Sequence, residues 1–337
     1  MPLILRADGD HAAWFACATP AMVRDWRSKL QNARLWFGFV ILAPFTGPSG
    51  SGWADVREAQ LAVLELPFSG VGSAIDIGDV DSPYGAYHPR NKQLVGARLA
   101  LAALDQLYGV PTAWRGPAFA GASVAPAAGG ALTVTLGFDD RSLGAGGLVL
   151  DWARNNSACP AGVSADICEA FVALATPGDN PVPPAFTYSG AGYITAGGDI
   201  GTCANCTVAA AEAACVAAPN CVGFTFMSNY SDCRDHANGE CNVLLKSNFD
   251  FTASATWQTF AAAGRRGDGL VRLNLTAVAV SADLREVVLT TAPPAVGQRL
   301  AAVSYAYSTW PVTPLYNAAG MPAVPFFYNV SAASYLR

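Results

Sequence analysis

Residues 75–109 constrain the fold more than any other stretch, because a strand, a turn and a helix follow one another there directly. Ile75 and Ile77 alternate with other residues as in a strand, and residues 79–85 are rich in turn-forming types. Pro89 suits the first position of a helix, where its missing N–H has no intrahelical partner. The apolar residues that follow recur at steps of three and four, which predicts a helix packed on a sheet.

His88 lies at this predicted crossing from strand to helix, near where open α/β sheets place their chemistry. Histidine titrates near neutral pH, so it can accept a proton from a serine hydroxyl while a carboxylate orients it. Asp79 and Asp81 are the nearest carboxylates in the turn and are the candidates for that role. Each could equally cap the turn by bonding to backbone N–H groups. A histidine held only by backbone hydrogen bonds at a helix start is the alternative interpretation.

The residues before this stretch predict the first half of a doubly wound α/β domain. Residues 12–31 have the pattern of a helix, and residues 35–45 form a near-continuous apolar run typical of a strand covered on both faces. A helix over residues 53–66 follows and leads back to the strand that contains Ile75. This order predicts an α/β fold with a partial doubly wound parallel sheet in residues 1–111.

Residues 112–184 and 263–337 predict an accessory β-sandwich with a C-terminal tail, because short strands alternate there with turns. The proline-rich and aromatic segment 309–327 is expected to be extended and to lie on a surface. Trp310 and Tyr316 in this segment are either packing residues or an aromatic platform for a sugar, and packing is the favoured interpretation.

Residues 185–262 interrupt the strand pattern and carry six of the nine cysteines. Their spacing, C-x2-C-x8-C-x5-C-x11-C-x7-C, favours disulfides in an oxidising compartment over a metal site. A closed zinc site needs paired thiolates, and Cys203 and Cys206 supply only one such pair. Cys159 and Cys168 bracket a short loop and are also expected to pair. We therefore expect no metal and no cofactor, and a structural zinc protein is the weakest alternative.

Charge and length exclude two classes of partner. A net charge of −5 with only 20 basic residues gives no basic stripe for nucleic acid. The apolar run 35–45 is too short to span a bilayer. The cysteines and five N-x-S/T sequons predict a secreted or lysosomal protein of the secretory pathway, although residues 1–10 do not form a convincing signal peptide. We expect the natural N-terminus to be missing. The sequons are at Asn155, Asn205, Asn229, Asn274 and Asn329.

The segment IDIGDVDSPYGAYHPRNKQLVGARLALAALDQLYG (75–109) resembles the histidine block of the sialate O-acetylesterase family. That block is close to I-D-L-x-D, a short turn, I-H-P-x-[ND]-K-Q and a G/Y-x-R-L-A helix. Three further blocks agree in the same order: CATPAMVRDWR, GFVILAPF with WADVREAQ, and VSYAYSTWPVTPLYNAAGMPAVPFF. The resemblance covers roughly residues 10–150 and 265–330. It implies an SGNH-like hydrolase fold, with His88 as catalytic histidine and O-acetylated sialic acid or another acetylated sugar as substrate.

Parts of the family pattern are absent from this chain. The serine block, like G-x-I-x-x-S-x-G-G-T, and the block like W-x-Q-G-E-x-N that supplies oxyanion donors do not occur. Neither Ser49 nor Ser51 fits the G-x-S-x-G pattern. SGNH hydrolases commonly place an aspartate three residues before the histidine, where this chain has Gly85. We therefore expect the nucleophile upstream of these residues and the chain alone to be inactive.

The cysteine-rich insert at residues 185–262 resembles a PAN/apple-like module. The shared features are an alanine-rich helix, the strand CVGFTF and the late segment CNVLLKS. Such modules bind proteins or carbohydrates. The alternative function is therefore a noncatalytic secreted module that binds a glycan or protein ligand through this insert.

Overall fold

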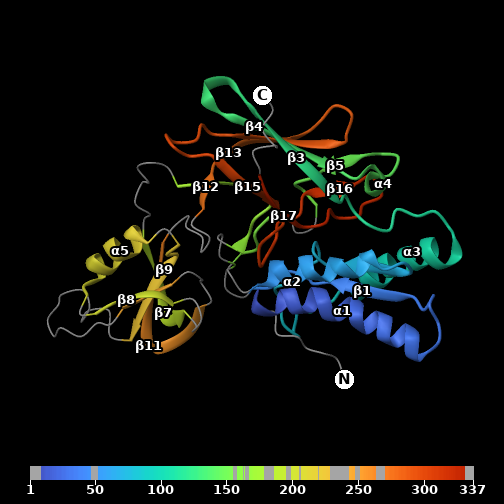
Figure 1. Ribbon diagram of the computed structural model, residues 1–337, viewed down its shortest axis with the longest axis horizontal. Helices are drawn as coiled ribbons and strands as arrows, with labels where there is room; N and C mark the ends of the chain where they lie inside the picture. The colour runs from blue at the N-terminus through green and yellow to red at the C-terminus, as the bar shows by residue number, and fades with distance from the viewer. Residues whose placement is uncertain are drawn as a thin grey trace.

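Three groups of elements are visible in the computed structural model of the chain (Figure 1). The helices between residues 9 and 108 lie together, the antiparallel strands of residues 119–138 and 271–329 lie beside them, and the described elements between residues 186 and 262 form a smaller body. For residues 186–194 and 251–262 the backbone alone is described. The structure describes residues 9–46, 52–154, 158–161, 163, 167–177, 186–194, 199–204, 206–218, 220–227, 243–246, 251–262 and 270–330.

The N-terminal part has the helices and the apolar strand that the sequence predicts. The strands β1 and β2 pair in parallel, with Phe37 opposite Ser69. In the described part of the chain the parallel sheet consists of these two strands, so the wider doubly wound sheet stays a prediction. The elements are α1 (Gly9–Lys29), β1 (Phe37–Ile41), α2 (Trp53–Gln60), the 3-10 helix η1 (Leu61–Glu65), β2 (Ser69–Ser73) and α3 (Lys92–Tyr108).

Glycines on one face of this small sheet allow α3 to pack against it. A Cβ on Gly70 would lie 2.7 Å from the Ala102 Cβ. A Cβ on Gly72 would lie 2.8 Å from Leu99 Cγ and 3.0 Å from the carbonyl oxygen of Val95. Because side chains of α3 and the Val95 carbonyl oxygen occupy that space, larger residues would push the helix away from the sheet.

Gly72→Ala is expected to lower the free energy of unfolding by about 1–3 kcal/mol, because the added methyl group overpacks this contact. Gly96→Ala is the matched control. Gly96 lies in α3, and a Cβ there would meet nothing within 4 Å. That control should be neutral or stabilising by up to about 1 kcal/mol, as alanine favours a helix over glycine. Urea unfolding followed by circular dichroism measures both, and equal stability of the two variants would contradict the packing.

Two four-stranded antiparallel sheets form the predicted β-sandwich. One has the order β12-β6-β15-β17 and the other β13-β14-β4-β3. Strands of both contribute to one hydrophobic core, which includes Leu136, Leu289, Ala173 and Val303. The strands are β3 (Phe119–Pro126), β4 (Leu132–Phe138), β6 (Phe171–Ala175), β12 (Val271–Leu273), β13 (Leu275–Val280), β14 (Glu286–Thr291), β15 (Leu300–Tyr305) and β17 (Phe326–Asn329).

The cysteine-rich segment forms its own five-stranded sheet, in the order β7-β11-β9-β10-β8, with α5 packed on it. The predicted helix and CVGFTF strand are both present, as α5 and β9. Its PAN/apple-like character and the domain boundaries at 111, 184 and 262 stay predictions. The elements are β7 (Phe186–Ile194), β8 (Asp199–Cys203), α5 (Val208–Ala217), β9 (Gly223–Met227), β10 (Val243–Lys246) and β11 (Phe251–Ala262).

Disulfides join the cysteines that the structure describes in this segment and its neighbour. The predicted Cys159–Cys168 pair is confirmed. Two further bridges join Cys203 to Cys206 and Cys215 to Cys221, while Cys233 and Cys241 lie outside the described residues. No cluster of three or more potential metal ligands occurs among the described residues.

Two local predictions for residues 75–109 are wrong. The strand β2 ends at Ser73, so Ile75 and Ile77 lie in the turn that follows, where both are buried. The helix α3 begins at Lys92 and not at Pro89. Asn91 is its N-cap, and the Asn91 side chain accepts a hydrogen bond from the backbone N–H of Leu94.

The C-terminal segment predicted to lie on a surface is instead mostly buried. Trp310 and Tyr316 are each 1% exposed, so both are packing residues. The segment includes β16 (Leu315–Asn317), which pairs with β5 (Leu148–Leu150). It passes against the N-terminal helices because the buried guanidinium of Arg57, in α2, donates hydrogen bonds to the carbonyl oxygens of Ser308 and Thr309.

Candidate active site

The turn formed by residues 79–90, hereafter the His88 turn, connects the region after β2 to the start of α3. The Ser82 hydroxyl donates a 2.7 Å hydrogen bond to the carbonyl oxygen of His88. The backbone N–H of His88 donates to the carbonyl oxygen of Gly85. Gly85 has a φ of 93°, a conformation that strains residues with a Cβ. The position three residues before His88 therefore has a backbone conformation that favours glycine.

Asp79, the first residue of the turn, binds Arg90, its last residue. Its carboxylate accepts hydrogen bonds from Arg90 Nε at 2.7 Å, from a terminal guanidinium nitrogen at 2.8 Å and from the backbone N–H at 3.1 Å. The hydrogen bond from the Arg90 side chain holds the pKa of Asp79 below its usual value. Asp81 is exposed in the same turn. The structure thus brings Asp79 to Arg90 and brings neither carboxylate to the His88 imidazole within the described residues.

Asp79→Asn is expected to loosen the His88 turn, because a neutral amide is a weaker partner for Arg90. Hydrogen exchange of the His88 and Arg90 amides should become several-fold faster, while Asp81→Asn should leave it unchanged. Folding lowers the pKa of Asp79. The ion pair between Asp79 and Arg90, which we call the clamp, is therefore complete above the usual carboxyl pKa of 3.8 and is lost as the pH falls below that value and the carboxylate is protonated. Unchanged exchange in Asp79→Asn would show that the turn does not depend on this clamp.

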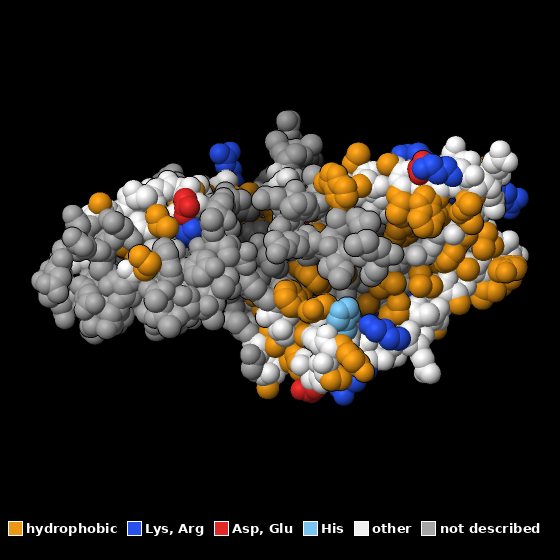
Figure 2. Space-filling view, turned by 90° about the horizontal axis from the view of Figure 1, so that it is seen from below, with side chains coloured by type: hydrophobic (Ala, Val, Ile, Leu, Met, Phe, Trp, Pro, Cys, Tyr) orange, Lys and Arg blue, Asp and Glu red, His pale blue; other side chains and the backbone are white. Residues whose placement is uncertain are grey.

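The His88 imidazole is exposed and borders an open hollow. The hollow is lined by Tyr84, His88, Pro89, Arg90 and Lys92. The His88 ring contacts the Tyr87 ring, with 4.4 Å between centroids. Figure 2 shows the histidine side chain at the surface, bordered by hydrophobic and basic side chains. Within the described part of the chain the imidazole has no hydrogen-bond partner.

A buried ion pair lies directly before the His88 turn. Arg98 of α3 donates hydrogen bonds of 2.6 and 2.8 Å to the two carboxylate oxygens of Asp76. The same guanidinium donates to the carbonyl oxygen of Ser73 at the end of β2. The side chains of Arg98 and Asp76 are 4% and 3% exposed. The pair therefore fixes the chain, where it leaves the sheet, to the helix that follows the turn.

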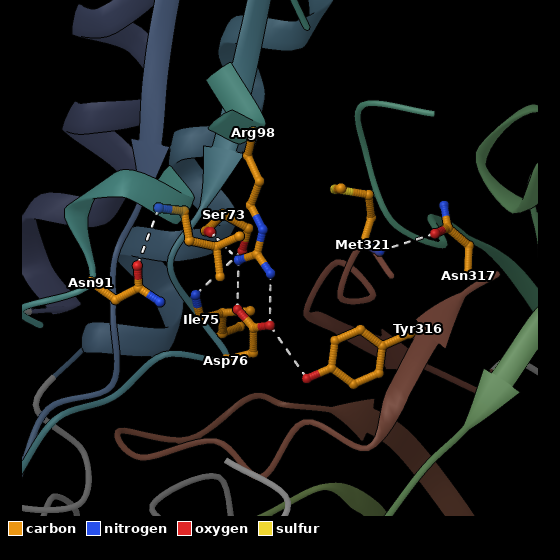
Figure 3. Close-up of polar contacts among 9 residues, drawn as sticks. Ser73, Ile75, Asp76, Asn91, Arg98, Tyr316, Asn317 and Met321 are labelled. Carbon is orange, nitrogen blue, oxygen red and sulfur yellow. Dashed lines mark hydrogen bonds and ion pairs between the residues drawn. The ribbon is translucent and has the colours of Figure 1, made fainter. Parts of the chain in front are cut away.

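Tyr316 joins this pair from the C-terminal segment. Its hydroxyl donates a 3.3 Å hydrogen bond to Asp76, so that Arg98 and Tyr316 reach the carboxylate from separate elements (Figure 3). Burial, and next the Asp76 carboxylate, raise the pKa of Tyr316 above its usual range, which keeps the hydroxyl protonated as a donor. The guanidinium of Arg154 lies 4.4 Å from the centre of the Tyr316 ring.

The C-terminal segment also supports the turn by packing. A Cβ on Gly78 would lie 2.6 Å from the Trp310 ring, so the chain passes against the indole just before the turn begins. Arg57 donates to the carbonyl oxygens of Leu42 and Ala43 as well as to Ser308 and Thr309. Burial lowers the pKa of Arg57 to about 9, which still leaves it charged at neutral pH.

The sequence indicated His88 but not the contacts among Asp76, Arg98 and Tyr316 next to its turn. Asp76 and Arg98 both fall within the family motif, in I-D-I and in G-A-R-L-A, but nothing in the motif shows that they pair. Tyr316 is 240 residues from Asp76. One sequence signal could have indicated the pair. Asp76 and Arg98 stand among apolar residues, and a charged residue is rarely buried without a partner.

His88 thus lies on the turn between the parallel strand β2 and the helix α3, and its ring has no hydrogen-bond partner among the described residues. No family model matches the chain. Sialate O-acetylesterase of Mus musculus is 36% identical over 110 residues, which cover 28% of this chain and 20% of the relative. Sialate O-acetylesterase of Homo sapiens is 34% identical over 110 residues, with 28% and 21% covered.

A carbohydrate acetylesterase of Xanthomonas citri is similar in structure, with a TM-score of 0.48, 21% sequence identity, and coverage of 97% of this chain and 48% of that chain. The curated sequence matches confirm the family resemblance of the motifs: over 110 residues the chain is similar to the sialate O-acetylesterases. The matched region spans about a fifth of the length of these relatives. None of the described helices is long and apolar enough to cross a membrane.

Proposed function

We propose that this chain supplies the histidine of an acetyl-ester hydrolase that acts on O-acetylated sugars. The carrying observation is the His88 turn, which holds an exposed imidazole at the edge of a hollow and leaves both of its ring nitrogens unbonded among the described residues. The sialate O-acetylesterase relatives support an acetylated sialic acid as the first substrate to test.

In this proposal His88 takes the proton of a serine hydroxyl while the serine oxygen attacks the acetyl carbonyl carbon. The protonated histidine then gives that proton to the sugar oxygen, and the sugar leaves as a free alcohol. Water attacks the acetyl-enzyme in the second half, with His88 again as base, and acetate is released. Asp79 and Asp81 remain the candidates for the orienting acid, and Asp79 would have to leave Arg90 to take that role.

The nucleophile is proposed to lie outside the residues of this chain. Among the described residues Ser82 contacts His88, but its hydroxyl donates to the His88 carbonyl oxygen rather than to the ring. Ser49 and Ser51 lie outside the described residues. The alternative function, glycan or protein binding by residues 185–262, stays a prediction without a specific observation in its favour.

Passage through the secretory pathway belongs to the same proposal. The disulfides among the described cysteines support an oxidising compartment. The sequon residues Asn274 and Asn329 are exposed, while Asn155, Asn205 and Asn229 lie outside the described residues.

Acetate release from 9-O-acetyl-N-acetylneuraminic acid, followed by proton NMR, tests the function. The chain alone should release no acetate above the uncatalysed rate, and a longer protein that adds the serine block should release it in a His88-dependent manner. Release by the chain alone would place the nucleophile within these residues, and Ser49→Ala and Ser51→Ala would then locate it. Absence of release by the longer protein would overturn the function.

A further inference from the structure

Three aromatic side chains meet beside His88, and we call them the aromatic cluster: Phe45, Trp53 and Tyr87. Their ring centroids are 4.8 Å apart for Phe45 and Trp53, 5.3 Å for Phe45 and Tyr87, and 6.1 Å for Trp53 and Tyr87. The indole N–H of Trp53 donates a 2.8 Å hydrogen bond to the carbonyl oxygen of Ala43. The cluster is thus held in place from outside the His88 turn, by the chain after β1 and by the first residue of α2.

The cluster differs from the aromatic residues of the core because it reaches the surface. Tyr87 is 41% exposed, and Phe45 and Trp53 are partly exposed. Trp310 and Tyr316, the other aromatic residues considered for a sugar platform, are buried and cannot meet a ligand. Tyr87 contacts the His88 ring directly, and Tyr84, which is 74% exposed, lines the hollow on which His88 also borders.

This arrangement combines two kinds of contact that a sugar ring needs. A pyranose has an apolar face of C–H groups, which pack against the electron-rich face of an aromatic ring. Its hydroxyl groups need polar partners, and Lys92 and Arg90 line the hollow next to His88. A flat apolar ligand would use only the aromatic cluster, whereas a sugar would use both.

We propose that the aromatic cluster is a sugar-binding platform on which the pyranose ring stacks against Tyr87, with its polar edge toward the hollow. The proposal rests on the proposed function, because the stacked ring would bring a substituent acetyl ester to the His88 imidazole. In this proposal Tyr87 binds the sugar ring and so favours carbohydrate esters, while His88 acts as the base in acetyl transfer.

Binding to the chain as it exists tests the platform without any need for catalysis. The probes are N-acetylneuraminic acid and methyl β-D-galactopyranoside, each followed by saturation-transfer NMR and by titration. Tyr87→Ala should weaken binding of the better probe by about tenfold or more, because the stacking face is lost. Tyr87→Phe keeps the ring and should bind within about twofold of the original chain.

Tyr108→Ala is the matched control, because Tyr108 is also exposed, at 73%, but lies at the far end of α3. It should bind as the original chain does, and circular dichroism should show all three variants folded. Equal binding by Tyr87→Ala and the original chain, or no binding of either probe by the original chain, would overturn the platform. Sugar binding that depends on Tyr87, together with acetate release unaffected by His88→Ala in the longer protein, would leave the platform standing and overturn the proposed function.

Discussion

Asp76→Ala is expected to lower the free energy of unfolding by about 3–5 kcal/mol, because it leaves the buried Arg98 guanidinium without its carboxylate. The Arg98 and Asp76 side chains are 4% and 3% exposed, so the unpaired guanidinium would remain shielded from bulk water. Tyr316 loses its acceptor in the same variant. Urea unfolding followed by circular dichroism and by tryptophan fluorescence measures the change.

The double variant Asp76→Leu/Arg98→Met is the control for this prediction. Removing both charges removes the desolvation penalty as well as the attraction, so it should recover a large part of the stability lost in the single variant. Tyr316→Phe should cost only about 1 kcal/mol, the net worth of one hydrogen bond. A loss below about 1 kcal/mol in Asp76→Ala would show that the ion pair does not hold this region together.

His88→Ala is expected to reduce acetyl-ester hydrolysis by about 10⁴-fold or more in a longer protein that carries the serine block. The reason is that the serine hydroxyl is a weak nucleophile until a base takes its proton. Steady-state hydrolysis of 4-nitrophenyl acetate measures this effect. The loss should appear mainly in kcat, because the small substrate depends little on the binding surface.

The other two histidines of the chain, His11 and His236, are the controls for this prediction. Replacing either by alanine should leave hydrolysis within about twofold of the original rate, because no catalytic role is assigned to them. Stability of His88→Ala should also be nearly unchanged, since the imidazole is exposed and has no hydrogen-bond partner in the described part of the chain. Undiminished turnover in His88→Ala would show that another group is the base.

Local features of the fold were predictable because they depend on neighbouring residues. The apolar run before Phe45 predicted the strand β1 but was wrong about its burial on both faces, because Gly38 and Val40 are exposed. The spacing of Cys159 and Cys168 predicted their bridge. The same local rules failed at Ile75 and Pro89. The Ile75 side chain is buried beside a turn instead of in a strand, and the cap at Asn91 decides where α3 begins.

Contacts across the chain were beyond these rules. The carbonyl oxygens of Ser308 and Thr309 that accept from Arg57 are backbone groups, so no side chain in the sequence marks them. The prediction that the C-terminal segment lies on a surface was wrong. Its prolines and aromatic residues indicate an extended chain, but they do not indicate which elements cover it.

The motif marks His88 as the candidate catalytic residue, and that role stays a prediction. The hydrogen bonds between Arg90 and Asp79 show a structural use for a residue that the sequence offered as an orienting acid. The positive φ of Gly85 explains why an aspartate is disfavoured three residues before the histidine. The identity of the orienting acid stays a prediction.

Release of acetate from 9-O-acetyl-N-acetylneuraminic acid, compared between the longer protein and its His88→Ala variant, is the most direct measurement of the proposed function. The predicted result is equal amounts of acetate and free N-acetylneuraminic acid from the original protein, with release by the variant near the uncatalysed rate. Equal release by both proteins, or hydrolysis of 4-nitrophenyl acetate without any release from the sugar ester, would contradict it.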